Sequence, residues 1–187
     1  MYYILKKDPF PEPEPYRTQS IGWNENSDDY EFIIGECVTS TFEKPFEFEL
    51  WEYDEGSNGV AEFYYEAFPL MSDALINALK SAGVDNLQTF PAVLRNFESN
   101  LVRTDYKVVN VVGKLRAADM SKSKYIDMGG TGLMAVGFKD LVIDESKVNN
   151  AKMFRLAESI TDVIIHESVK NELEKGEFKY LRYMPCE

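Results

Sequence analysis

Apolar and polar residues alternate along FEFELWEY, residues 46–53 of the chain. This period of two is typical of a β-strand with one buried face. The apolar positions on the predicted inner side are Phe46, Phe48 and Leu50. The positions predicted to point outward are Glu47, Glu49, Trp51 and Tyr53. The strand would therefore present an acidic and aromatic face to solvent.

The residues that follow predict a hairpin. Asn58-Gly59 is a dipeptide that favours a type I′ turn, and residues 60–68 (VAEFYYEAF) resume a strand-like pattern. The first part of the chain is therefore expected to contain a β-hairpin with one apolar face and one acidic, aromatic face.

A helical period replaces the alternation in residues 70–83 (LMSDALINALKSAG). Leu75, Ala78, Leu79 and Ala82 recur at the spacing of an amphipathic helix. Ser72 is the expected N-cap, and Gly83 suits the residue just beyond the helix end.

The remaining pattern is rich in strands. Residues 84–94 predict a turn and a short strand, residues 106–113 a central strand apolar on both faces, and residues 116–137 a long surface loop with short extended pieces. A short helix is expected over 167–176, with Ser168 as N-cap and Val169 and Leu173 facing the core. The other strand candidates are residues 138–145, 153–157, 161–166 and 178–184. This order predicts an α+β fold with a mixed, mostly antiparallel sheet and two main helices.

Charge divides the chain unevenly. Residues 1–67 hold 16 acidic and four basic residues, a balance of −12, whereas residues 68–187 hold 16 of each. Residues 8–31 are also rich in proline and acid, which favours an extended path on the surface. We therefore predict an acidic, Pro-rich and hairpin-containing part, 1–67, packed on or beside an α+β domain, 68–187.

This charge distribution narrows the class of partner. Phosphate binding needs a basic patch, so nucleic acid is disfavoured, and a basic protein partner is favoured because opposite charge speeds encounter. The alternative is that the acidic surface serves solubility alone. The basic cluster Lys114, Arg116, Lys122 and Lys124 lacks interleaved aromatic residues and is a weak signal for nucleic acid.

Targeting and cofactor signals are missing from the sequence. The apolar run at the N-terminus is too short for a signal peptide, and no run approaches the roughly 18 residues of a membrane-spanning helix. Cys37 and Cys186 lie far apart without metal-ligand spacing. We therefore expect a cytoplasmic protein with reduced thiols, no membrane association, no metal and no cofactor.

His166, the single histidine, is the obvious catalytic candidate. It ends a predicted strand, next to a predicted helix, and no nucleophile-elbow motif accompanies it, which favours a structural role. GGTG at 129–132 is not a phosphate-loop motif and favours a mobile loop. Only the acidic and aromatic residues, Glu47, Glu49, Trp51 and Tyr53, form a candidate binding site. The alternative is that another part of the domain covers Trp51 and Tyr53.

Four segments carry a resemblance to a known family: MSDALINALKSAGVDNLQTFPAVL, YKVVNVVGKLRAADMSKSKY, FKDLVIDES and FRLAESITDVIIHESVKNELE. From about Leu70 to Leu173, the chain resembles an immunity-protein family of bacterial polymorphic toxin systems, the eleventh in the usual numbering and formerly an uncharacterised domain family. The resemblance implies a protein that binds a toxin delivered between competing bacteria, and it supplies no catalytic residues. The family-motif positions, which the resemblance implies to be structural, are Asp85, Asn86, Pro91, Asn110, Asp119, Phe154, Arg155 and His166.

The combined expectation is a non-enzymatic immunity protein that neutralises a cognate toxin, in particular a cationic nuclease. Two alternatives stay open at this point. One is a small hydrolase or transferase that uses His166, and the other is a scaffold protein that binds an unrelated partner.

Overall fold

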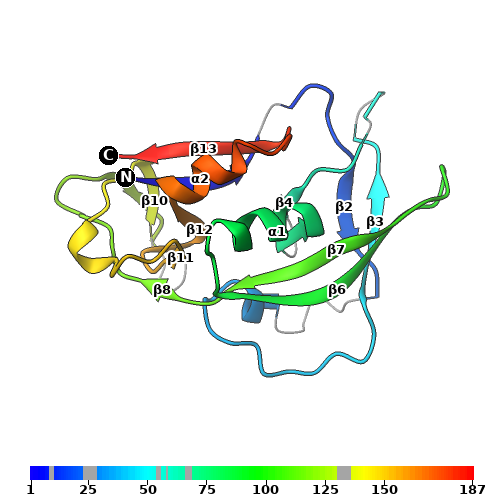
Figure 1. Ribbon diagram of the computed structural model, residues 1–187, viewed down its shortest axis with the longest axis horizontal. Helices are drawn as coiled ribbons and strands as arrows, with labels where there is room; N and C mark the ends of the chain where they lie inside the picture. Colours follow the sequence, from blue (N-terminus) through cyan, green and yellow to red (C-terminus); the bar gives the residue numbers. More distant parts are fainter. Residues whose placement is uncertain (9–10, 23–28, 54–55, 58, 66–68, 130–135) are drawn as a thin grey trace.

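The computed structural model describes the whole chain except residues 9–10, 23–28, 54–55, 58, 66–68 and 130–135. The described residues form two α-helices, two short 3₁₀ helices, and strands that assemble into a five-stranded sheet, a six-stranded sheet and a two-stranded ribbon (Figure 1). Neither helix in this part of the chain has the length and apolar character needed to cross a membrane. These sheets and helices confirm the α+β class.

The five-stranded sheet joins the two ends of the chain. Its order is β13 (Leu181–Cys186), β1 (Tyr2–Lys7), β12 (Ser159–His166), β11 (Met153–Leu156) and β8 (Lys114–Leu115). The β11–β8 pair is parallel and the other pairs are antiparallel. The first strand of the chain therefore lies inside this sheet, between two strands from its last 30 residues.

The six-stranded sheet has the order β2 (Arg17–Ser20), β3 (Phe46–Trp51), β6 (Leu87–Asn96), β7 (Leu101–Val111), β5 (Pro69–Ser72) and β4 (Phe63–Tyr65). Only the β3–β6 pair is parallel. β7, which includes most of the predicted central strand, has neighbours on both sides. Strands from the first 67 residues enter both sheets, and the division of the chain at residue 67 stays a prediction.

The expected hairpin is wrong. β3 pairs with β2 on one side and with β6 on the other, so neither of its edges is left for the strand that follows it. That following strand, β4, pairs with β5 instead, and Asn58 of the expected turn lies outside the described residues. Alternation shows that a strand is half-buried, but it does not select the neighbour that supplies the hydrogen bonds.

Helix α1 (Asp73–Ser81) confirms the predicted amphipathic helix and both of its ends. The Ser72 hydroxyl accepts a hydrogen bond from the Leu75 amide at 3.2 Å, which satisfies one of the free N–H groups of the first turn. Gly83 follows the C-cap with φ +84°, a conformation that a side chain would strain. Leu75 and Leu79 are fully buried.

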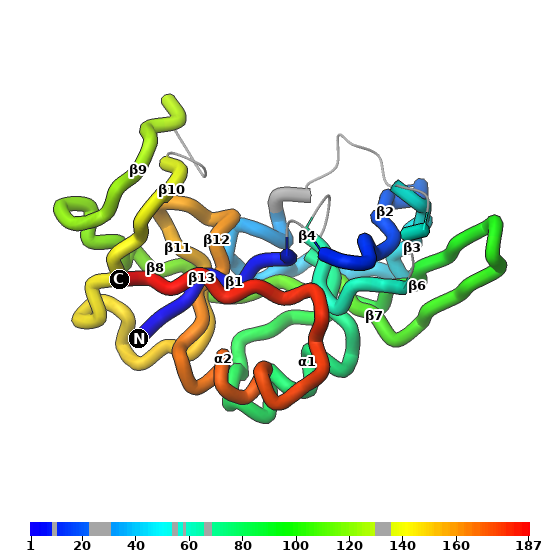
Figure 2. The backbone as a smooth tube through the Cα atoms, turned by 90° about the horizontal axis from the view of Figure 1, so that it is seen from above, coloured from blue at the N-terminus to red at the C-terminus, as the bar shows by residue number. Residues whose placement is uncertain are grey.

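Helix α2 (Glu167–Leu173) buries Val169 and Leu173 as predicted, but the expected N-cap at Ser168 is wrong. His166 caps the helix, because its Nδ1 accepts the Ser168 backbone N–H at 3.1 Å. The helix therefore begins one residue before Ser168. Figure 2 shows α1 and α2 side by side below the strands, where they cover the junction of the two large sheets.

The predicted loop over 116–137 contains the strand β9 (Lys124–Asp127), which pairs with β10 (Val136–Asp140) in a projecting ribbon (Figure 2). The 3₁₀ helices are η1 (Asp29–Phe32) and η2 (Glu145–Lys147). Residues 130–132 of the GGTG motif lie outside the described part of the chain.

Candidate functional site

Strand β3 separates its side chains as the sequence predicts. Phe46, Phe48 and Leu50 are 6%, 2% and 1% exposed and belong to the core beneath the sheet. Glu47, Glu49 and Trp51 point to the opposite side, where Glu47 and Trp51 are exposed and Glu49 is half-buried. Tyr53 follows the strand and contacts Trp51. We call these four outward residues, Glu47, Glu49, Trp51 and Tyr53, the β3 face.

Both rings of the β3 face reach solvent. Trp51 is 38% exposed and Tyr53 is 52% exposed. Their ring centroids lie 6.1 Å apart at an interplanar angle of 61°, an edge-to-face contact that aromatic pairs prefer. Each ring therefore keeps part of its surface in solvent.

Arg17 holds Tyr53 from the neighbouring strand. Arg17 on β2 lies opposite Trp51, and its guanidinium carbon is 3.5 Å from the centre of the Tyr53 ring. Its Nη2 is also 3.8 Å from a carboxylate oxygen of Glu14. Stacking of this kind orients the Tyr53 ring and places one cation inside an otherwise acidic face.

The two carboxylates of the face lie beside uncharged and basic neighbours. In the parallel register of β3 and β6, Glu47 lies opposite Val93, and Glu49 lies opposite Arg95. Among the described residues, neither glutamate has an ion-pair partner within 4 Å. Their charge is therefore available to an incoming cation without breaking an existing pair.

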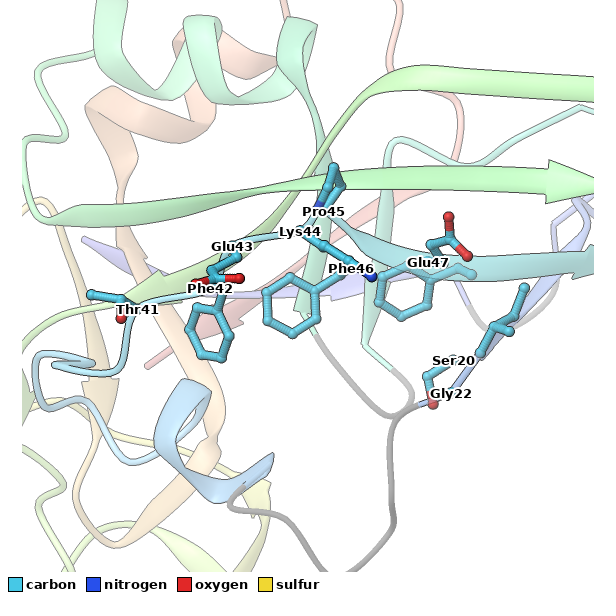
Figure 3. A pocket seen from close by; sticks show the side chains of 11 residues that line it. Ser20, Gly22, Thr41, Phe42, Glu43, Lys44, Pro45, Phe46 and Glu47 are labelled. Carbon is cyan, nitrogen blue, oxygen red and sulfur yellow. The ribbon is translucent and has the colours of Figure 1, made fainter.

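A groove of about 680 Å³ opens at the start of β3, where segments 20–22 and 41–48 meet. Figure 3 shows the rings of Phe42 and Phe46 pointing to one side of the chain and the Glu47 carboxylate pointing to the other. Phe42 and Phe46 lie 4.9 Å apart between ring centroids. The groove therefore places aromatic rings at the start of β3, on the side of the strand opposite the Glu47 carboxylate.

The family-motif residue Arg155 is fully buried on β11 and ties distant segments together. Its Nη1 donates to the Tyr65 hydroxyl at 2.6 Å and to the Ile160 carbonyl at 3.0 Å, and its Nη2 donates to the Phe32 carbonyl at 3.0 Å. Burial raises the pKa of the Tyr65 hydroxyl above its usual value, and nearby Arg155 opposes that rise. The guanidinium therefore links both large sheets with η1.

Two asparagines anchor loops to the sheets. Asn110 is fully buried on β7, and its Nδ2 donates to the Glu36 carbonyl at 2.6 Å. The Asn86 amide donates to the carbonyl oxygens of Val112 and Met153 at 2.5 and 2.9 Å, joining the start of β6 to β11. Such bonds satisfy buried carbonyl groups that strand pairing leaves free.

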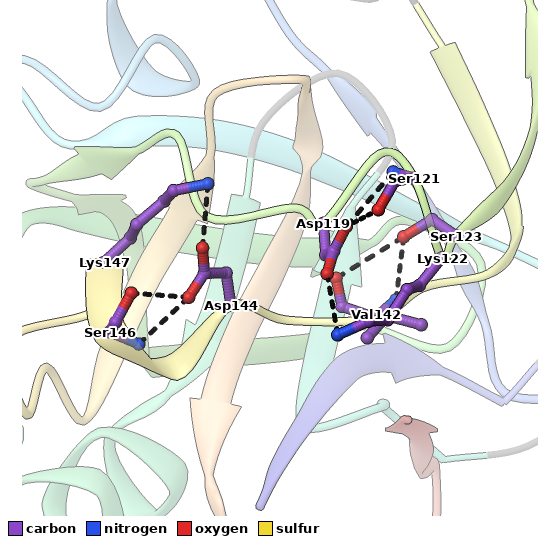
Figure 4. Close-up of polar contacts among 8 residues, drawn as sticks. All are labelled: Asp119, Ser121, Lys122, Ser123, Val142, Asp144, Ser146 and Lys147. Carbon is purple, nitrogen blue, oxygen red and sulfur yellow. Dashed lines mark hydrogen bonds and ion pairs between the residues drawn. The ribbon is translucent and has the colours of Figure 1, made fainter.

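Asp119 forms one of two matching turns, DMSK (119–122) and DESK (144–147). In each turn the aspartate accepts bonds from the serine two residues on and pairs with the lysine three residues on (Figure 4). The Ser121 hydroxyl and Lys122 lower the pKa of Asp119 to about 2. Backbone hydrogen bonds also connect the two turn segments to each other. The Asp119 N–H donates to the Val142 carbonyl, and the Asp144 N–H donates to the Ala117 carbonyl.

The other motif positions differ in exposure. Asp85 and Pro91 are exposed, with Pro91 opposite Lys107 in the sheet. Phe154 is buried in edge-to-face contact with Tyr2, with centroids 5.9 Å apart. These positions do not converge on the β3 face.

His166 lies at the junction of β12 and α2. Its Nδ1 accepts the Ser168 amide at 3.1 Å and lies 2.9 Å from the Ser168 hydroxyl, while its ring packs edge-on against Tyr2. This nitrogen is thus shared with a backbone N–H of the first helical turn, the geometry of an N-cap. In the described part of the chain, no group of three or more His, Cys, Asp and Glu residues is arranged to hold a metal ion.

Comparison with known proteins defines the class. A family model for immunity proteins matches residues 40–187, which is most of the chain. The chain belongs to that family, the immunity protein family Imm11, and is thereby an immunity protein of the toxin-neutralising kind. No curated protein matches it. The match begins shortly before β3, so the β3 face lies within the family region.

Sequence reasoning missed the groove and the partners of Arg155. Both features join segments that lie far apart in the sequence, so no local pattern predicts them. The paired turns did leave a signal, because Asp-x-Ser-Lys occurs twice, at 119–122 and 144–147.

Proposed function

We propose that this immunity protein neutralises a cationic toxin, specifically a nuclease, by binding it through the β3 face in the cytoplasm. The observation that carries the proposal is the combination of two carboxylates, which have no ion-pair partner among the described residues, with two exposed aromatic rings, all on β3 or just after it. A nuclease must hold phosphate with Lys or Arg, and those residues would complement Glu47 and Glu49.

The two kinds of residue would contribute differently. Exposed carboxylates raise the rate of encounter with a basic surface, and this effect weakens as salt screens it. Trp and Tyr anchors slow dissociation, and each can contribute about 2 kcal/mol or more when it is desolvated by the partner. Inhibition by contact requires both, because the toxin must be captured quickly and then held.

Charge reversal on the face tests this assignment. The variant Glu47→Lys/Glu49→Lys raises the net charge from −12 to −8 and places that change within the face. We expect its association rate with the cognate toxin domain to fall about tenfold at low salt and to depend less on salt.

The matched control is Glu177→Lys/Glu187→Lys, which makes the same change in net charge at two exposed positions away from β3. Its association rate should stay within about twofold of the unmodified protein, because long-range charge contributes little beyond the Debye length. Equal rates for the two double variants would contradict the assignment of the β3 face.

A further inference from the structure

The β3 face continues across neighbouring strands. In the six-stranded sheet, Gln19 lies opposite Glu49, Glu49 opposite Arg95, and Arg95 opposite Val102. Residues directly opposite one another project from the same face of a sheet. A single row of side chains therefore crosses β2, β3, β6 and β7: Gln19, Glu49, Arg95 and Val102.

Helix α1 covers only part of this side of the sheet. Lys107, Val109 and Val111 lie on the same side of β7 as the row, and α1 packs over Val109 and Val111 near β5. Lys107 pairs with Asp73 in the first turn of α1, with Nζ 2.9 Å from the carboxylate oxygen. Beyond this point Val102 is 47% exposed. The surface left open by α1 therefore extends from the β3 face along the β6–β7 hairpin.

The hairpin projects past β3. The paired register of β3 ends at Arg95, whereas β6 and β7 continue to pair through Asn96 and Leu101, and Figure 1 shows their tip extending outward. Phe97 in the connecting turn is 60% exposed. An apolar residue of this size at a projecting tip can reach into a pocket of a partner.

The turn that carries Phe97 is ordered by its own hydrogen bonds. The Asn96 side-chain oxygen accepts the backbone N–H groups of Glu98 and Ser99 at 3.0 and 2.8 Å. Asn100 takes the left-handed conformation with φ 56°, which asparagine tolerates better than most residues. Phe97 is therefore presented by a pre-formed turn, so little conformational entropy would be lost when it binds.

Interface size favours the larger surface. A stable interface covers roughly 800 Å² on each partner, equivalent to a square about 28 Å on a side. One strand is only about 5 Å wide, so the β3 face alone is too narrow, whereas four strands span roughly 15–20 Å. The projecting tip adds length along the direction of β6 and β7.

We propose that the β3 face, Arg95, Val102 and Phe97 form one docking surface for the toxin, with Phe97 and Val102 as an apolar anchor at its far end. The inference rests on the proposed function and adds the partner's chemistry. The toxin surface would carry basic residues opposite Glu47 and Glu49, a carboxylate opposite Arg95, and an apolar pocket that receives Phe97.

The test compares two pairs of exposed apolar residues. Phe97→Ala/Val102→Ala removes the proposed anchor, and Ile126→Ala/Met128→Ala removes side chains that are 52% and 64% exposed on and beside the β9–β10 ribbon. Binding to the inactivated cognate toxin domain is measured by calorimetry and by dissociation kinetics. We expect the first variant to bind at least tenfold more weakly, mainly through faster dissociation, and the second to change less than twofold.

The outcomes separate the two proposals. If the Phe97/Val102 variant binds normally while the Glu47/Glu49 reversal binds slowly, the anchor is wrong and the β3 face stands. If neither the Phe97/Val102 variant nor the Glu47/Glu49 reversal changes binding, both proposals are wrong. Weaker binding of the Ile126/Met128 variant alone would place the docking surface on the ribbon. Unchanged thermal unfolding verifies that each variant folds, and slower amide exchange across residues 94–103 in the complex supplies support that needs no variant.

Discussion

Arg155 allows a quantitative test of what joins the two large sheets. Its guanidinium is fully buried and donates to the Tyr65 hydroxyl and to the carbonyl oxygens of Phe32 and Ile160. Among the described residues, no carboxylate lies within ion-pair distance of it. Its charge is therefore stabilised by neutral dipoles from β4, η1 and β12. We predict that Arg155→Met destabilises the fold.

Two opposing effects set the size of this change. Loss of the guanidinium leaves two buried carbonyl groups and the part-buried Tyr65 hydroxyl without their donor, at about 2 kcal/mol each, or roughly 6 kcal/mol together. Removing a buried charge recovers desolvation free energy of about 3 kcal/mol. The free energy of unfolding should therefore fall by about 3 kcal/mol, which for a chain of this size lowers Tm by roughly 6–12 °C.

Urea and thermal unfolding of the unmodified protein, Arg155→Met and Arg155→Lys would measure the effect. The lysine variant keeps the charge, but its single ammonium group cannot reproduce the planar fork that reaches acceptors in three segments. It should therefore lose at least as much stability as the methionine variant. An Arg155→Met protein as stable as the unmodified chain would refute the reasoning, because desolvation of the charge would then outweigh its hydrogen bonds.

Three further predictions concern single groups. His166→Ala removes the cap of α2 and should lower the free energy of unfolding by about 1 kcal/mol, whereas His166→Asn should restore most of it; urea unfolding distinguishes the two. Asp119 has a pKa of about 2 in the folded protein and about 3.9 in the unfolded chain. The stabilisation from its charge is therefore fully present above about pH 3.9 and is lost as the pH falls through about 2. Stability measured from pH 5 to pH 2 should therefore fall less steeply in Asp119→Asn than in the unmodified protein. Burial raises the pKa of the Cys186 thiol to about 12, so alkylation at pH 8 of the folded protein should modify exposed Cys37 and spare Cys186; equal labelling would contradict that burial.

Local patterns predicted local structure well. Helix α1 follows from the spacing of Leu75 and Leu79 and from the cap residues at its two ends, and the exposure pattern of β3 follows from its alternation. Each of these features depends on interactions within about ten residues, which the sequence displays directly.

The pairing of strands that lie far apart in the sequence could not be predicted from such local patterns. β1 lies between β12 and β13, and β3 lies beside β6, although these partners are separated by tens of residues or more than a hundred. The alternation in a strand specifies which of its faces is buried, but it does not specify which strand lies beside it. The hairpin expected from Asn58-Gly59 followed from local sequence alone and was wrong because β3 and β4 pair with other strands. The cap of α2 was misplaced because a histidine nitrogen took the role expected of Ser168.

Hydroxyl-radical footprinting of the protein with its inactivated toxin tests the central claim most directly, because it reports which side chains the partner covers. Trp51 and Tyr53 react readily when exposed, and Tyr125 on the ribbon, 43% exposed, provides an internal reference. Toxin binding should slow oxidation of Trp51 and Tyr53 several-fold and leave Tyr125 unchanged. Unaltered oxidation of Trp51 and Tyr53 in a saturated complex would contradict the account.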